Sequence, residues 1–344
     1  MLGVILLHYN GAPGHAMDAV VPGSLNFYII FTLENLFVCA VDLFLLISGF
    51  FLCTGGRRSG WKALELIIQV ILYAEGVYLL RVLLHLERFS VSGVLMQLVP
   101  DNYFVILYVT VYLLSPYLNL LARGLAGKGK TFRTCLILMG ALFSVWTLVT
   151  DLGAELLGAQ WQGISTIAMQ GSQNGYTIVN FGMMYLIGAY LRLDRTESRP
   201  TGNLLAAFIG NAVLLTGASA AAKLRGLPIT EILWAYCNPL VMVNAVLIFQ
   251  LFRQLKMPAV KWINTLASGA FSVYLLHAMF LQFARVPWAA EQNAAVLLGH
   301  MALTAAAIYL LCWCAHMVYH WVTEPVFRAL RKRFPLLLPE TGEA

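Results

Sequence analysis

The chain has 344 residues, of which 60% are hydrophobic and 11% are charged, and its mean hydropathy is +0.76. Soluble domains carry about 25% charged residues and about 45–50% apolar ones. This composition therefore excludes a soluble enzyme and predicts a chain that lies almost wholly within a membrane. The net charge of +6 is compatible with a nucleic-acid partner, but the positions of the basic residues explain the charge without one.

Ten apolar segments follow one another with short connections. Because a helix needs about 20 apolar residues to cross a hydrocarbon core of about 30 Å, they predict an all-α bundle of about ten transmembrane helices. The segments are 1–10, 25–53, 63–83, 102–121, 134–151, 177–192, 203–221, 236–252, 264–284 and 294–320. No low-complexity run separates them, so we expect one domain over 1–334 and a short tail over 335–344.

The basic residues gather on one side of this predicted bundle. If the N-terminus is cytoplasmic, 17 of the 22 Lys and Arg residues fall in connections or in the tail on the cytoplasmic side. Such an excess marks the cytoplasmic connections of membrane proteins. We therefore expect both termini in the cytoplasm, a lipid bilayer as the surroundings and no nucleic-acid partner.

The first segment, 1–10, is apolar from Met1 onward, yet nine helical residues reach across only about half of a hydrocarbon core. Either this helix is a half-span or the natural protein begins upstream, and the even number of crossings favours a truncated first helix. His8 lies here, and histidine is the side chain best suited to take a proton from a hydroxyl near neutral pH. A histidine hydrogen-bonded within a helix bundle is the alternative.

The second segment, 25–53, contains an acid and a pair of small residues. A carboxylate within a membrane span is unfavourable by roughly 3 kcal/mol, so we expect Asp42 to face a protein interior. There it either orients a base such as His8 or pairs with a structural cation. Ser48 and Gly49 either loosen the helix and offer polar groups to a ligand or permit close helix packing.

Two further groups of polar residues are candidates for substrate binding. Arg57, Arg58 and Lys62 follow the second segment at the predicted cytoplasmic rim, where they either hold the phosphates of a donor or only fix the topology. Tyr274 and His277 lie three residues apart, on one face of a predicted helix. They either line an acceptor cavity or are satisfied within the core.

A histidine pair near the end of the last segment resembles part of a metal site. His316, His320 and Glu324 recur every four residues, but steps of four residues drift by about 40° each around a helix. No other segment offers an obvious further ligand. We therefore expect no metal and no tightly bound cofactor.

Short motifs resemble, in order, those of the acyltransferase-3 family of integral membrane acyltransferases. The matching stretches are 6–9, 41–50, 102–104, 112–116, 185–190, 272–277 and 324–325. Together they cover essentially the whole chain. One departure is that the family pattern places an Arg eleven residues before the first-helix His, which here falls ahead of Met1 and agrees with a truncated start. A second is Tyr103, which stands where Trp is common.

The resemblance implies an enzyme of the bacterial plasma membrane that transfers an acyl group, in the first instance acetyl, from cytoplasmic acyl-CoA to a hydroxyl of a cell-surface glycan. His8 is then the general base or a transient acyl carrier, and Asp42 shapes the site with it. The residues expected to line the acceptor cavity are Ser48, Tyr103, Tyr274 and His277. The cations expected at the phosphates of coenzyme A are Arg57, Arg58 and Lys62.

Two other classes of protein share this composition: a transporter or flippase for a glycan precursor, and a ligand-binding membrane sensor. Transporters tend to contain inverted repeats and paired broken helices, and no internal repeat is evident in the sequence. A sensor is expected to carry an attached output domain, and none follows the membrane segments before Ala344. Both considerations favour the enzyme.

Overall fold

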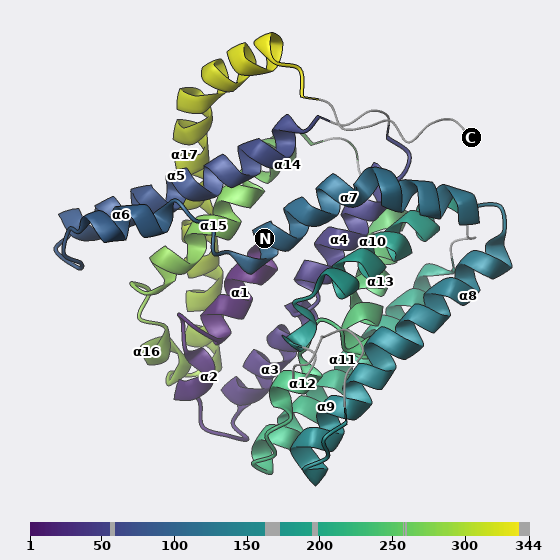
Figure 1. Cartoon of the computed structure of the whole chain (residues 1–344). Coiled ribbons are helices and arrows are strands. Elements are labelled where there is room, and N and C mark those ends of the chain that lie inside the picture. The colour runs from purple at the N-terminus through teal and green to yellow at the C-terminus, as the bar shows by residue number, and fades with distance from the viewer. Residues whose placement is uncertain (56–58, 162–172, 195–198, 257, 259, 337–344) are drawn as a thin grey trace.

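The computed structural model describes residues 1–55, 59–161, 173–194, 199–256, 258 and 260–336 (Figure 1). Within this part of the chain every element of secondary structure is helical, which confirms the predicted all-α class. The elements are α1 (Leu2–Asn10), α2 (Ala16–Ala19), α3 (Leu25–Phe37), α4 (Ala40–Leu52), α5 (Trp61–Leu83), α6 (Val91–Gln97), α7 (Tyr103–Leu125), α8 (Gly129–Gly140), the π-helical η1 (Ala141–Val145), α9 (Trp146–Leu157), the 3₁₀ turn η2 (Gln173–Gly175), α10 (Ile178–Leu193), α11 (Thr201–Leu224), α12 (Thr230–Leu233), α13 (Pro239–Gln254), α14 (Lys261–Ser268), α15 (Ala270–Leu281), α16 (Val286–Ala290) and α17 (Ala294–Arg333).

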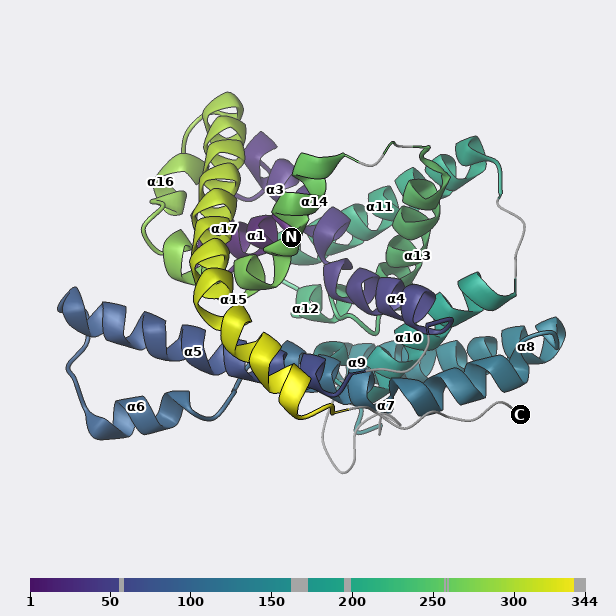
Figure 2. The same cartoon turned by 90° about the horizontal axis from the view of Figure 1, so that it is seen from above.

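The long helices surround a short first helix. In Figure 1, α8 and α9 line one flank of the bundle and α17 lies on the opposite flank, with α1 and α4 between them. Figure 2 shows the bundle from above, with the start of α1 inside its outline. Helix α1 packs against α3, α15 and α17, so the position of His8 is set by elements from both ends of the chain.

Six helical stretches of the described residues are long and apolar enough to cross a membrane, as expected for a multi-pass membrane protein. They are Leu25–Leu52, Trp61–Leu83, Tyr103–Leu125, Gly129–Leu157, Thr201–Leu224 and Ala294–Arg333. Helices α14 and α15, bent by 60°, make a seventh if they form one span. Helices α10 and α13 have 16 residues each, or about 24 Å of helix. Every predicted segment is thus helical, while ten crossings and cytoplasmic termini stay predictions.

Side-chain caps fix where two of these helices begin. The Asn102 side chain accepts a hydrogen bond from the Val105 N–H at 3.2 Å, at the start of α7. The Thr177 hydroxyl accepts one from the Asn180 N–H at 3.3 Å, at the start of α10. Each such cap stabilises a helix by about 1 kcal/mol. Asn102 and Asn180 therefore have defined positions, and both contact predicted site residues.

Helices α4 and α10 pack with their backbones in close contact. A Cβ atom on Gly49 would overlap the carbonyl oxygen of Tyr185, and one on Gly188 would overlap the carbonyl oxygen of Leu46. Small residues permit this approach between membrane helices. The structure thus gives Gly49 the packing role, and the contact brings α10 alongside the segment that carries Asp42.

We expect Gly188→Ala to destabilise the bundle more than Gly182→Ala on the same helix. Both substitutions gain about 1 kcal/mol of helix propensity. A Cβ on Gly182 meets no atom within 4 Å, whereas one on Gly188 forces α4 and α10 apart, and overpacking costs about 1–3 kcal/mol. Thermal unfolding of both variants in the same detergent measures the difference, and equal melting temperatures would contradict the packing described.

Candidate active site

His8 lies in the last turn of α1, where the chain folds back over the end of the helix. The Gly11 N–H donates to the Leu7 carbonyl and the Gly14 N–H to the His8 carbonyl, each at 2.9 Å. The His8 ring donates from Nδ1 to the Ala12 carbonyl at 2.8 Å. Because a carbonyl oxygen only accepts, Nδ1 carries the proton and Nε2 of the neutral ring holds a lone pair. The half-buried ring therefore offers a basic nitrogen.

The imidazole of His277 lies against that of His8, because α1 and α15 are side by side (Figures 1 and 2). The ring centroids are 4.7 Å apart and the planes meet at 61°. His277 donates from Nδ1 to the Val273 carbonyl at 2.9 Å, and its buried Nε2 has no hydrogen-bond partner in the described residues. An unpaired buried acceptor costs about 1–3 kcal/mol. This nitrogen is thus suited to accept a hydrogen bond from a bound hydroxyl.

Asp42 is buried on α4 and binds a residue of α10. The Asn180 side-chain amide donates to Asp42 Oδ1 at 3.1 Å, and Oδ2 has no partner among the residues described. In this part of the chain no hydrogen bond joins Asp42 to His8. The structure does not bring the predicted acid and base into direct contact. It adds Asn180, which sequence reasoning did not single out, and only its closeness to the capping Thr177 could have drawn attention to it.

Tyr274 connects the two histidines to the start of α7. Its ring centroid lies 6.3 Å from that of His277, and its hydroxyl donates to Asn102 Oδ1 at 3.0 Å. His8, His277, Tyr274 and Asn102 thus form a continuous set, which we call the histidine–tyrosine row. It joins α1, α15 and the N-terminal cap of α7, and it unites His8 with Tyr274 and His277, which the sequence predicted as a pair on another helix.

Tyr103 and Ser48 contact residues outside this row. The Tyr103 hydroxyl lies 3.3 Å from that of Tyr236, and the rings of Tyr103 and Tyr176 are 4.4 Å apart. The Ser48 hydroxyl donates to that of Tyr108 at 3.4 Å. Sequence reasoning missed Tyr176 and Tyr236. Tyr176 lies in a connection and Tyr236 is the first residue of the predicted segment 236–252, so helical periodicity marks a face at neither position.

Lys62 lines a cavity of about 640 Å³ between α5, α14 and α17, which we call the Lys62 cavity. Two acids in its wall are paired with two cations of α17: Arg331 donates to Glu65 at 2.6 Å and to Glu324 at 2.8 Å, and Arg328 donates to Glu324 at 3.5 Å. Lys62 makes no ion pair with any residue that the structure describes. The cavity therefore contains an uncompensated ammonium group.

The remaining polar residues predicted at this end fall into two groups. His316 and His320 line the Lys62 cavity with their rings 6.0 Å apart, and His316 Nδ1 lies 3.1 Å from Ser272 Oγ. Among the residues described, no three His, Cys, Asp or Glu side chains are placed to hold a metal ion. Arg57 and Arg58 lie outside the described residues.

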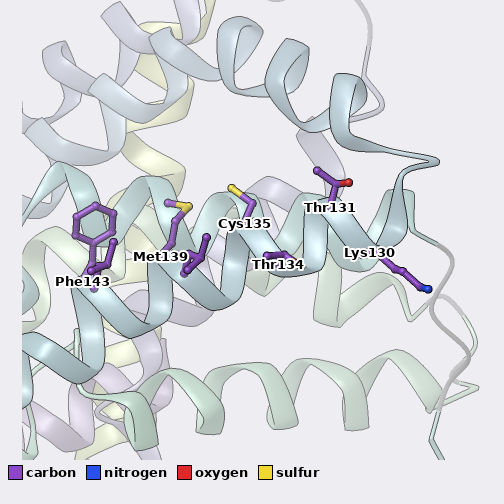
Figure 3. A pocket seen from close by; sticks show the side chains of 8 residues that line it. Lys130, Thr131, Thr134, Cys135, Met139 and Phe143 are labelled. Carbon is purple, nitrogen blue, oxygen red and sulfur yellow. The ribbon is translucent and has the colours of Figure 1, made fainter.

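A separate hollow of about 490 Å³ lies along α8 and contains none of the predicted site residues. Figure 3 shows that its side chains, including Cys135, Met139 and Phe143, all project from α8 and the π-helical turn that follows. Its surface is mainly apolar. The described residues that line it include no histidine and no carboxylate, so the histidine–tyrosine row is the better candidate for chemistry.

Comparison with known proteins gives the family of this chain. A family model described as an acyltransferase domain matches residues 1–317, a range that contains His8, Asp42 and His277. No curated protein and no solved structure matches the chain. Since the model covers most of a multi-helix membrane chain, the protein belongs to the acyltransferase-3 family and is a membrane acyltransferase.

Proposed function

We propose that this acyltransferase moves an acetyl group from acetyl-CoA to a hydroxyl of a cell-surface glycan, with His8 as the general base. The observation that carries the proposal is the pairing of His8 with His277 at 4.7 Å. Each Nδ1 is bound to a carbonyl, so each Nε2 is left as an acceptor. Two such acceptors in a bundle of apolar helices suit the abstraction of a hydroxyl proton.

In the proposed reaction the acceptor oxygen attacks the carbonyl carbon of the thioester while its proton passes to His8 Nε2. The bond between carbon and sulfur then breaks, and the imidazolium returns the proton to the coenzyme A thiolate. The products are the acetyl ester and free coenzyme A, and the histidine is neutral again. The acyltransferase family and the free Nε2 acceptor of the half-buried His8 ring support this sequence of steps.

The charge of the Lys62 cavity is an argument for a binding site for an anionic donor at one end of the bundle. Its two acids are balanced by Arg331 and Arg328, so Lys62 is left to attract phosphate. His316 and Thr265 in the same cavity add hydrogen-bonding groups. We place the phosphates of coenzyme A here, and the sequence adds Arg57 and Arg58, outside the described residues, as further candidate cations.

Replacing Lys62 by Ala is expected to raise the KM for acetyl-CoA about tenfold, the effect of losing one charged hydrogen bond. The assay follows thiol release from acetyl-CoA by the full chain in lipid nanodiscs. Lys130→Ala, in the hollow along α8, is the matched control and is expected to keep the wild-type KM. An unchanged KM for Lys62→Ala would contradict the donor site, and no thiol release by the wild type would contradict the proposed function itself.

A further inference from the structure

A second polar cavity lies on the opposite part of α5 from the Lys62 cavity. It has a volume of about 310 Å³ and is bounded by α5, by the segment that contains α6, and by the residues that precede α7. Helix α6 lies alongside α5 in Figures 1 and 2. Ligand pockets range over about 300–1,000 Å³, so this cavity has the size for a ligand of one or two rings.

The side chains of this cavity match a neutral molecule rich in hydroxyl groups. Arg81 donates to Glu87 at 3.1 Å, so these two charges compensate each other. Gln97 and Asp101 also line the cavity, and neither side chain makes a hydrogen bond or ion pair with another described residue. They leave carboxylate and amide groups open to sugar hydroxyls. The formal charge of the four side chains is negative, which disfavours a phosphate or carboxylate ligand.

The inner end of the cavity meets the histidine–tyrosine row. Asn102 lines the cavity and accepts the hydrogen bond from the Tyr274 hydroxyl at 3.0 Å. Leu275, which follows Tyr274 on α15, lines it as well. A ligand in this cavity therefore lies next to Asn102. Asn102 contacts Tyr274, which lies beside His277, and His277 lies against His8.

The two cavities approach each other at one buried hydroxyl. Gln69 lines the Lys62 cavity and Tyr73 lines the second cavity, and each donates to Ser272 Oγ at 2.9 Å. The Lys62 cavity, with its uncompensated cation, suits an anionic donor. The second cavity, with the uncompensated acid Asp101, suits a neutral acceptor. Opposite electrostatics thus separate the two substrates along α5 and α15.

From this arrangement we infer that the cavity formed by Gln97, Asp101 and Asn102 binds a neutral pyranose ring of the acceptor. One hydroxyl of the ring is directed toward Tyr274 and His277, and Asp101 excludes anionic sugars. That the bound sugar is the acceptor rests on the proposed acyl transfer. That a neutral sugar binds here rests on the side chains of the cavity alone.

The test is sugar binding to the full chain in nanodiscs, by saturation-transfer NMR without any acyl donor. The probes are the methyl glycosides of glucose, galactose and N-acetylglucosamine, with methyl glucuronide as the anionic counterpart. We expect a neutral probe to bind about tenfold more tightly than the glucuronide. Asp101→Asn is expected to remove this discrimination, while Asp18→Asn, an exposed acid outside the cavity, keeps it.

Failure to bind every neutral probe, tighter binding of the glucuronide, or discrimination unchanged in Asp101→Asn would each overturn the inference. Gln97→Ala adds a variant on another element and is expected to weaken neutral-probe binding about tenfold. The two proposals fail separately. A chain that binds sugar but releases no coenzyme A contradicts only the reaction, and one that releases coenzyme A but binds no probe contradicts only the cavity assignment.

Discussion

Replacing His8 by Ala is expected to lower the rate of acetyl transfer by about 10²–10⁴-fold, the contribution of a positioned general base. The hydroxyl proton then has no acceptor at the point where His8 Nε2 lies. The fold is expected to survive, because the ring is only half-buried and its hydrogen bond is to the local Ala12 carbonyl. Transfer of radiolabelled acetyl to the acceptor measures the loss directly.

His15→Ala is the matched control for this substitution. His15 lies in the next turn of the chain, is 55% exposed and pairs with Asp18 at 2.9 Å. Among the described residues no side-chain hydrogen bond or ring contact joins it to the histidine–tyrosine row, so its removal is expected to leave transfer unchanged. Equal activity in His8→Ala and His15→Ala would exclude His8 as the base.

Replacing His277 by Ala is expected to lower kcat by about 10–10²-fold with little change in the KM for acetyl-CoA. His277 packs edge-on against the His8 ring at 4.7 Å, so its loss frees that ring to rotate, and a misplacement of about 1 Å is enough for such an effect. His277→Gln retains a side-chain acceptor and a group of similar reach, and it is expected to recover part of the lost rate.

Separate values of kcat and KM, with thermal unfolding of the same samples, distinguish positioning from a purely structural role. A positioning residue changes kcat at an unchanged melting temperature and is partly rescued by Gln. If His277→Ala and His277→Gln both unfold early and lose activity in proportion, the residue acts only through packing.

The long helices could be predicted from the sequence because apolar runs of about 20 residues indicate membrane-spanning helices. The short helices α2, α6, α12 and α16 were missed because they are too brief for a periodic pattern to develop. The bend between α14 and α15 was missed as well. It occurs at Gly269, and a single glycine within an apolar run does not by itself indicate a bend, because a helix tolerates it.

Part of the candidate site followed from residue chemistry alone. His8 and His277 were both singled out as polar residues in apolar surroundings, but their contact joins helices from opposite ends of the chain and depends on tertiary packing. The Asp42 contact shows the same limit. An acid at that position requires a partner, yet nothing local distinguishes Asn180 from His8 as that partner.

The two cavities could not be predicted because each combines side chains that are remote in sequence. Lys62 is left uncompensated only because Arg331 and Arg328, on the last helix, pair with Glu65 and Glu324. Gln97 and Asp101 lie in a connection whose composition is ordinary for a loop, and only the fold places them beside α5. Charge balance within a cavity is a property of the tertiary structure, not of any one segment.

The single-turnover rate of acetyl transfer in His8→Ala, with donor and acceptor both saturating, tests most directly whether His8 carries the chemistry. Under these conditions neither binding nor product release contributes to the measured rate. A rate reduced by at least about 10²-fold, with both ligands still bound, is the predicted result. A wild-type single-turnover rate would show that acetyl transfer proceeds without His8 and would contradict the mechanism.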